Sequence, residues 1–419
     1  MKHIYASVDI GTDAIKVVVC ELYHSKLNLL AASETKSRGI KKGLITDVDL
    51  ARVSLREAMN EIEEMLGIRI RQVIASVPAY YANFGLVSSS IEIERTIDDE
   101  IGLIESSDIA AVLKQATENA YGVNEELVTT IPIDFKIDGV KVLKEPLGLP
   151  ATKLDVRGIM VTTPKKNIYS VVSLIQGIGI EVKDISINGI GDIYTYRTKE
   201  IDQKVGAIIN IGSETTSVSL YNRGIIVKNS MIGLGGKNIE NDLAYIYKLN
   251  RADAIAMKEK FALAHKRYAN AHEIMEVENK EGELIKVNQL EASEVVMARL
   301  DEILGLAKKE ISALTNREID YILVTGGTSN MTNFNQMVSE VLGRKASVGT
   351  IKLIGVRNNR YSSSIGNVLY YISKLKLLGI SDTMLDEDDV LELSSVDRNI
   401  GSVSNESMLG KVFGYFFNE

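Results

Sequence analysis

Short runs of apolar residues, each ended by a glycine turn, open the chain and predict β-strands. In Tyr5–Val19, one such run ends at the turn Asp9–Thr12 (Asp-Ile-Gly-Thr), and a second run, Ile15–Val19, follows directly. About two hundred residues later the pattern recurs, with Asn210–Ser213 (Asn-Ile-Gly-Ser) between two apolar runs. Two copies of one strand–turn–strand unit predict a molecule built from two similar halves.

Apolar residues at helical spacing alternate with these strand patterns. The sequence predicts helices over Asp49–Leu66, Lys165–Gln176, Gly191–Thr198, Ala252–Leu263, Leu290–Leu314 and Arg357–Lys376, and further strands over Val73–Val77 and Glu181–Ile187. The helix after the Glu181–Ile187 strand is expected to hinge the two halves, with Gly189 and Gly191 supplying backbone freedom. This mixture predicts an α/β fold.

Residues from about 84 to 161 interrupt the symmetry between the halves. They are expected to form a strand pair over Gly85–Arg95, a helix over Asp108–Tyr121, and strands over Leu127–Ile137 and Leu154–Val161. The stretch is therefore predicted to be an inserted α+β subdomain. The full set of predicted segments is 1–83, 84–161, 162–203, 204–232, 233–315, 316–356, 357–380, 381–407 and 408–419.

Two further glycine turns stand next to helices. A strand over Ile319–Val324 runs into Gly326 and Gly327, where the missing Cβ atoms would let a flat ring or a ribose approach the backbone. The turn Gly233–Gly236 leads into another helix, whose N-terminus is expected to present free N–H groups and a positive dipole to an anion. No Gly-x-x-x-x-Gly-Lys-Ser/Thr occurs, so a P-loop is excluded.

Composition narrows the class of protein. The chain has 419 residues, a net charge of −8 and one cysteine. The acidic balance, without a long basic run, argues against nucleic-acid binding, and a single cysteine fits a reducing cytoplasm. No apolar run approaches the 18 or so residues of a spanning helix, and no signal-peptide pattern precedes the first motif, so neither is expected.

The C-terminal part changes in composition. Residues 381–407 are rich in Asp and Glu and are predicted to form a disordered, extended linker. Residues 408–419 then place six apolar side chains on one helical face: Met408, Leu409, Val412, Phe413, Phe416 and Phe417. A core helix would have the same stripe, but the linker leaves it nothing nearby to pack against, so we favour a helix that lies on a membrane surface. With Lys411 as its one basic residue, a single tail should bind lipid only marginally, and many tails together should be needed.

The order of the motifs, two hairpins followed by a strand, a Gly-Gly turn and a helix, resembles the actin/Hsp70/sugar-kinase ATPase superfamily. Within it the chain resembles the FtsA family of bacterial actin-like cell-division proteins over nearly its whole length. The resemblance rests on Ser7–Gly11, Ser37–Ile45, Ala298–Ile303, Val324–Gly327 and the amphipathic tail. It implies an actin-like (ribonuclease H-like), duplicated, two-lobed ATPase fold with an inserted α+β subdomain. The loop Ser37–Asp47 is characteristic of the family, but the resemblance assigns it no chemical role. Alternatively, the loop is only a solvent-exposed connection between two elements.

The same resemblance implies a site for ATP and Mg²⁺. Gly11, Thr12, Gly212 and Ser213 would hold the phosphates and Lys16 would offer a countercharge, while Gly326 and Gly327 would face the adenosine with Gly236 nearby. Lys258 would lie near the adenine or face solvent. Asp9 would orient magnesium-bound water.

Asn210 stands where hydrolytic relatives usually carry an aspartate. Because an amide cannot accept a proton at neutral pH, slow or absent hydrolysis is expected, with ATP acting as a switch for polymerisation.

The resemblance also implies partners: the C-terminal peptide of FtsZ on the second lobe, further copies of the chain in a homopolymer, membrane lipid through the tail, and later divisome proteins on the inserted subdomain. Arg299 is a candidate contact for the FtsZ peptide, the alternative being a pair with Glu302 within its helix. The expected location is the cytoplasmic face of the membrane at the division site, as a peripheral protein. Two alternatives stay open: an actin-like pilus-assembly ATPase, and a metabolic kinase of the superfamily.

Overall fold

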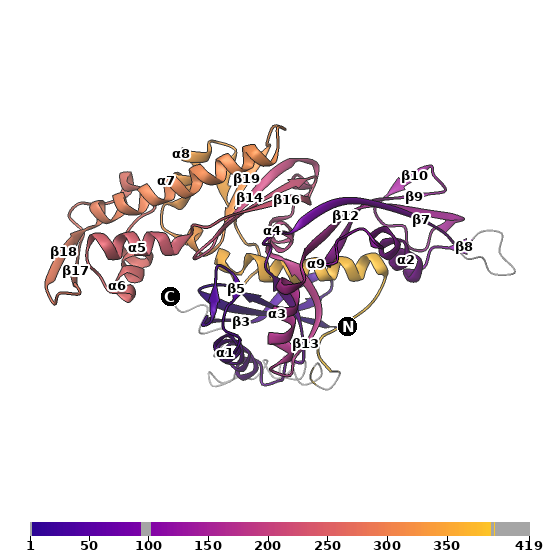
Figure 1. The fold of residues 1–419 in the computed structure, drawn as a ribbon, viewed down its shortest axis with the longest axis horizontal. Helices are drawn as coiled ribbons and strands as arrows, with labels where there is room; N and C mark the ends of the chain where they lie inside the picture. The colour runs from indigo at the N-terminus through magenta and orange to yellow at the C-terminus, as the bar shows by residue number, and fades with distance from the viewer. Residues whose placement is uncertain (1, 94–101, 387–388, 390–419) are drawn as a thin grey trace.

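The computed structural model describes residues 2–93, 102–386 and 389 (Figure 1). The predicted membrane helix, 408–419, and most of the predicted acidic linker lie outside the described residues. Figure 1 shows an elongated molecule, with one α-helical subdomain at the left end, the inserted subdomain at the right end, and two sheets between them.

Two five-stranded sheets have the same strand order, as the recurring turns predicted. In the first lobe the order is β13-β6-β1-β2-β3, where β1, β2 and β3 form an antiparallel meander and β6 runs parallel to β1. In the second lobe the order is β16-β15-β14-β19-β20, with β14 in the place of β1 and β19 in that of β6. The strands are β1 (His3–Ile10), β2 (Ala14–Tyr23), β3 (Lys26–Lys36), β6 (Gln72–Val77), β13 (Glu181–Ile187), β14 (Val205–Ile211), β15 (Thr216–Asn222), β16 (Ile225–Ile232), β19 (Tyr321–Thr325) and β20 (Ala346–Val348).

The helices of the two lobes bury one apolar face each. In α1 (Val48–Leu66) the buried side chains include Ala51, Leu55, Ala58 and Ile62, which recur at helical spacing. Asp47 caps its N-terminus by accepting hydrogen bonds from two backbone N–H groups of the first turn. The other lobe elements are α3 (Lys165–Gln176), α4 (Asn188–Tyr196), η1 (Ile201–Gln203), η4 (Gly327–Asn330), α8 (Phe334–Leu342), η5 (Asn359–Tyr361) and α9 (Ser362–Leu378), with the short strands β4 (Ile40–Lys41) and β5 (Leu44–Ile45) before α1.

The lobes meet where α4 crosses α9. A Cβ added at Gly366 of α9 would lie 1.6 Å from the carbonyl oxygen of Gly191 in α4, and one added at Gly191 would lie 2.3 Å from that of Ser363. The role of Gly189 and Gly191 in a hinge stays a prediction. Both lie inside a regular helix, where Gly191 is needed because the backbones of α4 and α9 touch. A Cβ at Gly189 would instead lie 2.7 Å from the hydroxyl of Ser219 in β15.

The inserted subdomain is an α+β unit with its own core, as predicted. Its elements are β7 (Asn83–Glu92), β8 (Gly102–Leu103), α2 (Ser106–Thr117), β9 (Glu125–Ile137), β10 (Lys141–Leu143), β11 (Pro150–Ala151) and β12 (Lys153–Pro164). The predicted strand pair over Gly85–Arg95 is wrong, because β7 is a single long strand at the edge of the sheet β10-β9-β12-β7. Its partner is β12, more than sixty residues further on, which local sequence cannot indicate.

The α-helical end of the second lobe contains α5 (Gly236–Ile246), α6 (Arg251–Ala256), the π-helical turn η2 (Met257–Phe261), η3 (Lys266–Tyr268), the hairpin β17 (Ile274–Glu278) with β18 (Leu284–Asn288), and the long helix α7 (Gln289–Leu314). The predicted helix Ala252–Leu263 is thus α6 continued by η2. Helix α7 lies where the sequence predicted the helix Leu290–Leu314.

The predicted linker begins too early. Residues 381–386 pack on the first lobe: the amide of Met384 donates to the carbonyl of Ile4 over 2.9 Å, Met384 and Leu385 are buried, and the Asp382 carboxylate accepts a 2.6 Å bond from Tyr371. The acidic residues around Met384 and Leu385 led to the prediction of a linker, although these two apolar side chains are buried. Linker-like behaviour is left as a prediction for the residues after Asp386.

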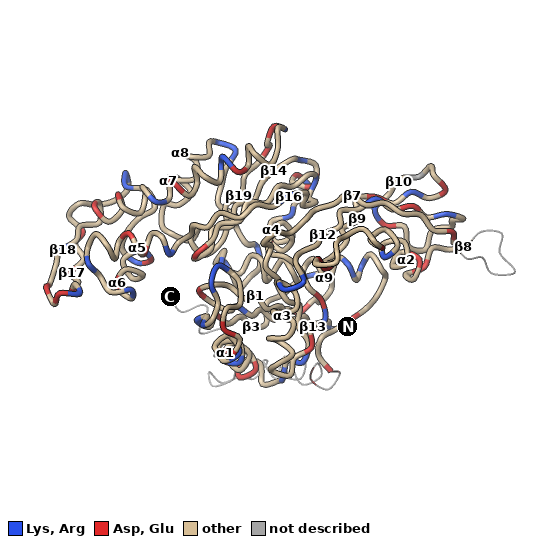
Figure 2. The backbone as a smooth tube through the Cα atoms, viewed as in Figure 1, with Lys and Arg blue, Asp and Glu red and all other residues tan. Residues whose placement is uncertain are grey.

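Positions of Lys and Arg alternate with positions of Asp and Glu along the described backbone (Figure 2). Among the described residues, no helix has the length and apolar character needed to span a bilayer.

Candidate functional site

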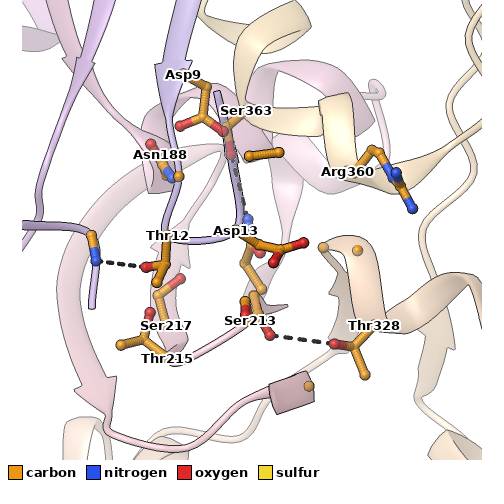
Figure 3. A pocket seen from close by; sticks show the side chains of 18 of the residues that line it. Asp9, Thr12, Asp13, Asn188, Ser213, Thr215, Ser217, Thr328, Arg360 and Ser363 are labelled. Atoms are coloured by element: carbon orange, nitrogen blue, oxygen red, sulfur yellow. Dashed lines mark hydrogen bonds between the residues drawn. The ribbon is translucent and has the colours of Figure 1, made fainter. Parts of the chain in front are cut away.

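A pocket of about 440 Å³ opens between the two lobes. Its walls include the first-lobe turn at Gly11, the second-lobe turn at Gly212, the Gly326–Gly327 turn and the start of α5. Figure 3 shows side chains from both lobes around it. The predicted residues Asp9, Gly11, Thr12, Lys16, Asn210, Gly212, Ser213, Gly236, Lys258, Gly326 and Gly327 all line this pocket.

The two turns are built alike. In the first lobe the amide of Gly11 donates to the carbonyl of Ala14 over 3.1 Å; in the second, the amide of Gly212 donates to that of Thr215 over 3.0 Å. Each turn joins the central strand of its sheet to the next antiparallel strand. The hydroxyls of Thr12 and Ser213 stand at the pocket beside these turns (Figure 3). Such turns can hold an anion, because neighbouring backbone donors and hydroxyls converge on one place.

The first turn carries an ion pair. Asp9 is 4% exposed, and its carboxylate lies 2.8 Å from the ammonium of Lys16, the residue opposite it on β2. The sequence predicted Lys16 as a countercharge for a ligand, but in this structure its charge is compensated by Asp9. The pair still faces the pocket, so a carboxylate and an ammonium are both available there.

A buried acid, Asp192 of α4, stands behind the second turn. Its carboxylate accepts hydrogen bonds from the amide of Asn210 (2.8 Å) and from the hydroxyls of Ser362 (2.7 Å) and Ser363 (2.9 Å). Burial raises the pKa of Asp192 to about 6, although these three donors act to lower it. The network ties both crossing helices to the second turn. Sequence analysis missed Asp192, because nothing near it in the chain marks it as part of the site.

Gly326 brings the third turn against the second. Its φ of +92° suits glycine, and a Cβ there would lie 2.5 Å from both the Asn210 side-chain oxygen and the Ile211 carbonyl. The hydroxyl of Thr328 donates to the carbonyl of Gly212 over 3.3 Å. Gly327 lines the pocket next to Arg360, which is ion-paired with Glu34 of β3. Sequence analysis missed this pair too.

The N-terminus of α5 does not offer free donors, contrary to the prediction. The amides of Gly236 and Lys237 each donate over 2.8 Å, to the carbonyls of Gly212 and Ser213, and the amide of Gly235 donates to the side chain of Asn238. These donors hold the second turn in place. The start of α5 therefore shapes the pocket, and Gly236 has no room for a side chain because a Cβ would lie 2.5 Å from the Thr328 hydroxyl.

Lys258 does not face solvent. The residue is 8% exposed, lines the pocket from η2 and is ion-paired with the equally enclosed Glu240 of α5. A carboxylate in such a place can accept hydrogen bonds from ligand hydroxyls. Glu240 was not predicted as a pocket residue. Its position one helical turn after Gly236 could have indicated that it lies on the same face of α5.

Arg299 lies outside the pocket, on α7. Its guanidinium binds the carboxylate of Asp242 on α5 with two hydrogen bonds, of 2.6 and 2.9 Å, and also pairs with Glu302. The alternative stated from the sequence, the pair with Glu302, is thus present. A partner's carboxylate at this place would have to compete with Asp242.

Comparisons with known proteins agree on one family. The family model described as "Cell division protein FtsA" matches residues 207–366, and that described as "SHS2 domain inserted in FTSA" matches residues 86–162. The chain is 26% identical over 383 residues to the cell division protein FtsA of Bacillus subtilis, covering 90% of this chain and 85% of that protein.

Solved structures support the fold. A type IV pilus biogenesis complex, PilM-PilN, aligns with a TM-score of 0.57 at 13% identity, covering 89% of this chain and 98% of the other. MreB5 of Spiroplasma citri bound to ADP aligns with a TM-score of 0.53 at 12% identity, covering 90% and 98%. The fold is therefore the actin-like ATPase fold with an inserted subdomain, as the sequence predicted. Since both family models are FtsA models and together cover more than half of the residues, the chain belongs to the FtsA family of cell division proteins.

Proposed function

We propose that the protein binds ATP with Mg²⁺ between its lobes and polymerises on the cytoplasmic face of the cell membrane at the division site. Its second lobe tethers FtsZ filaments, and its inserted subdomain contacts later divisome proteins. The observation that carries the proposal is the interlobe pocket, in which two matching glycine turns face each other in a member of the FtsA family.

Several features of the pocket support a nucleotide as its ligand. Each turn presents small residues and a hydroxyl, which suits a phosphate chain, and Gly326 and Gly327 leave room for a nucleoside. The similar MreB5 structures are of proteins bound to ADP and to AMPPNP. Asp9 fits a role toward magnesium, since Mg²⁺ in such sites takes few protein ligands and keeps its waters and the ligand's phosphates.

Titration calorimetry with Mg²⁺ and ATP tests this site directly. The full chain should bind ATP, and Gly326→Val should abolish binding, because its side chain would collide with the backbone of the second turn. Gly305→Ala on α7, where a Cβ meets nothing within 4 Å, is the matched control and should bind like the unmodified chain. Equal binding by both variants would refute the interlobe site.

Slow or absent hydrolysis is proposed for the same site. Asn210 is an amide, and the nearby acid Asp192 is enclosed by three hydrogen-bond donors. Four other carboxylates that line the pocket, Asp9, Asp13, Glu34 and Glu240, are ion-paired. Glu259 lines the pocket without an ion pair among the described residues, so a metabolic kinase with a carboxylate base stays an alternative. Phosphate release at rates typical of a sugar kinase would overturn this part of the proposal.

Membrane attachment is proposed from the sequence of residues 408–419. Six large apolar side chains are worth roughly 10 kcal/mol when buried, and ordering a dozen residues costs a comparable amount, so one tail is marginal and a polymer is needed. Co-sedimentation with anionic vesicles should pellet the full chain with ATP, whereas a variant ending at Ser407 should stay in the supernatant. Equal pelleting would refute the anchor.

Tethering of FtsZ is proposed for the surface of α5 and α7 around Arg299. Because Arg299 already binds Asp242, a carboxylate of the FtsZ C-terminal peptide would have to share or replace that contact. Arg299→Gln should weaken binding of that peptide in fluorescence anisotropy about tenfold, while Lys309→Gln, also on α7 and exposed, should leave it unchanged. Unchanged binding by the Arg299 variant would remove this residue from the interface.

A further inference from the structure

The segment Ser37–Asp47, to which sequence analysis assigned no chemistry, lies at the mouth of the interlobe pocket. Two of its residues, Lys42 and Gly43, line the pocket. The segment is a small closed loop: β4 and β5 pair with each other, and the amides of Thr46 and Asp47 both donate to the carbonyl of Gly39. Gly39 has a φ of +69°, and a Cβ there would lie 2.3 Å from the Asp47 carbonyl. The loop is therefore held in one shape by its own backbone.

This segment holds the first turn. The hydroxyl of Ser37 donates to the carbonyl of Gly11 over 2.7 Å, and the amide of Ser37 donates to the carbonyl of Asp13 over 2.8 Å. The amide of Gly43 donates to the hydroxyl of Thr12 over 2.7 Å, a bond drawn in Figure 3. The loop thus fixes which way the Thr12 hydroxyl points at the pocket.

The same segment reaches across to the second lobe. The amide of Lys42 donates to the carboxylate of Glu214, which stands in the second turn and is also ion-paired with Lys237. Burial acts to raise the pKa of Glu214, but Lys237, the Lys42 amide and the positive charge of the Lys42 ammonium together keep it below its ordinary value. Glu214 therefore stays ionised, and adjacent residues of one loop bind the two turns of opposite lobes.

The charge of Lys42 acts on Glu214 at a distance, but the ammonium forms no ion pair among the described residues and can still contact a ligand. Of the other basic groups at the pocket, Lys16 is paired with Asp9, Lys258 with Glu240 and Arg360 with Glu34. Lys260 of η2 also lines the pocket and forms no ion pair among the described residues. No carboxylate lies within ion-pair distance of the Lys42 ammonium in the part of the chain that the structure describes. That ammonium lies 3.6 Å from the Cβ position of Gly233, on the second-lobe side of the pocket mouth, and the side chain is exposed and free to turn.

We propose that the two residues of the loop that line the pocket, Lys42 and Gly43, form a third phosphate-binding element and that the ammonium of Lys42 binds the terminal phosphate of a bound nucleoside triphosphate. This inference rests on the proposed nucleotide site and deepens it. A lysine held at the seam between the turns is close to where the end of a triphosphate chain would emerge. A diphosphate would not reach it, so Lys42 would distinguish ATP from ADP. Because its amide is bound to Glu214, occupancy would also strengthen contact between the lobes.

The test compares Lys42→Met with Lys41→Met in the full chain, by titration calorimetry with Mg²⁺ and either ATP or ADP. Lys41 is the preceding residue of the same loop, is exposed, and does not line the pocket, so it is the matched control. We expect Lys42→Met to bind ATP on the order of tenfold more weakly with ADP affinity unchanged, since a charge-assisted hydrogen bond is lost. Lys41→Met should behave like the unmodified chain, and Lys42→Arg should retain most of the ATP affinity.

Three results would count against the inference. Unchanged ATP affinity in Lys42→Met, or an equal loss for ATP and ADP, would overturn the role of Lys42 while leaving the nucleotide site intact. An equal loss in Lys41→Met would reduce the effect to the general charge of the loop. Failure of the unmodified chain to bind either nucleotide would instead refute the proposed function on which the inference depends.

Discussion

The first and second turns have the same backbone hydrogen-bond pattern but carry different charged groups. Each is closed by one glycine amide bond of similar length, 3.1 Å at Gly11 and 3.0 Å at Gly212. The first places its acid, Asp9, at the pocket and balances it with Lys16 on the next strand. The second places a neutral amide, Asn210, at the pocket and keeps its acid, Asp192, behind it in α4.

Because of this difference, the carboxylates of the two turns can have different roles, although the two turns have the same backbone geometry. A carboxylate at the pocket can act on magnesium-bound water, as proposed for Asp9. A carboxylate behind the pocket, bonded to α9 and to the second turn, can only act through Asn210 and the helix crossing. We infer that the second turn is arranged for transmitting a change between the lobes rather than for proton transfer.

The largest expected effect comes from giving the second turn an acid of its own. Asn210→Asp would place two carboxylates where 2.8 Å now separates the Asn210 amide nitrogen from Asp192. Because two buried like charges repel, the free energy of unfolding at pH 7.5 should fall by about 3 kcal/mol, measured by chemical denaturation. The double variant Asn210→Asp with Asp192→Asn moves the acid to the pocket and should recover most of the loss. It should also raise phosphate release if the amide is what limits hydrolysis.

Removing the cation of the first turn should have the next largest effect. Lys16→Met leaves the almost fully buried Asp9 without its partner, so the free energy of unfolding should fall by about 2 kcal/mol at pH 7.5. Lys36→Met, an exposed lysine at the end of β3, is the control and should change it little. Matching stability in both variants would show that Asp9 is compensated by other groups.

The two glycines that close the turns should tolerate alanine differently. A Cβ at Gly11 would lie 2.7 Å from the Ala14 carbonyl, whereas one at Gly212 would lie 3.1 Å from that of Thr215. Gly11→Ala should therefore lower the free energy of unfolding by about 1 to 3 kcal/mol, and Gly212→Ala by less than about 1 kcal/mol. Thermal unfolding of the two variants side by side checks this. The reverse order would mean that the second turn is the tighter one.

The smallest effect, and the one with a distinct pH dependence, concerns Asp192. Its pKa rises from the ordinary 3.8 to about 6 in the fold, so the protonated form is favoured there and the stability contribution of the group declines as pH rises from 3.8 through 6. Asp192→Asn removes this decline. The variant should gain about 1 kcal/mol over the unmodified chain at pH 8, with the gain shrinking toward pH 4, as measured by melting temperature across that range. A gain that does not depend on pH would contradict ionisation as its cause.

Local pattern was enough to predict most of the secondary structure, and together with the family resemblance it indicated residues that line the interlobe pocket. Strands β1, β2, β14 and β19 and helices α3 and α7 follow from apolar spacing, because burial of one face is decided over neighbouring residues. The glycine turns could be predicted because a tight turn limits which residues fit. The partner of β7, by contrast, lies far along the chain, and local pattern predicted the wrong pairing there.

The sequence by itself determined the duplicated turns, the inserted subdomain and the family, since each depends on residues that are close together in the chain or on their order. Only the tertiary structure decided which charges meet: Lys16 with Asp9, Arg360 with Glu34, Asp192 behind Asn210, and the loop amides of Lys42 and Gly43 with the turns of opposite lobes. Electrostatic pairing depends on distance and burial, and both are set by packing between segments that can be hundreds of residues apart.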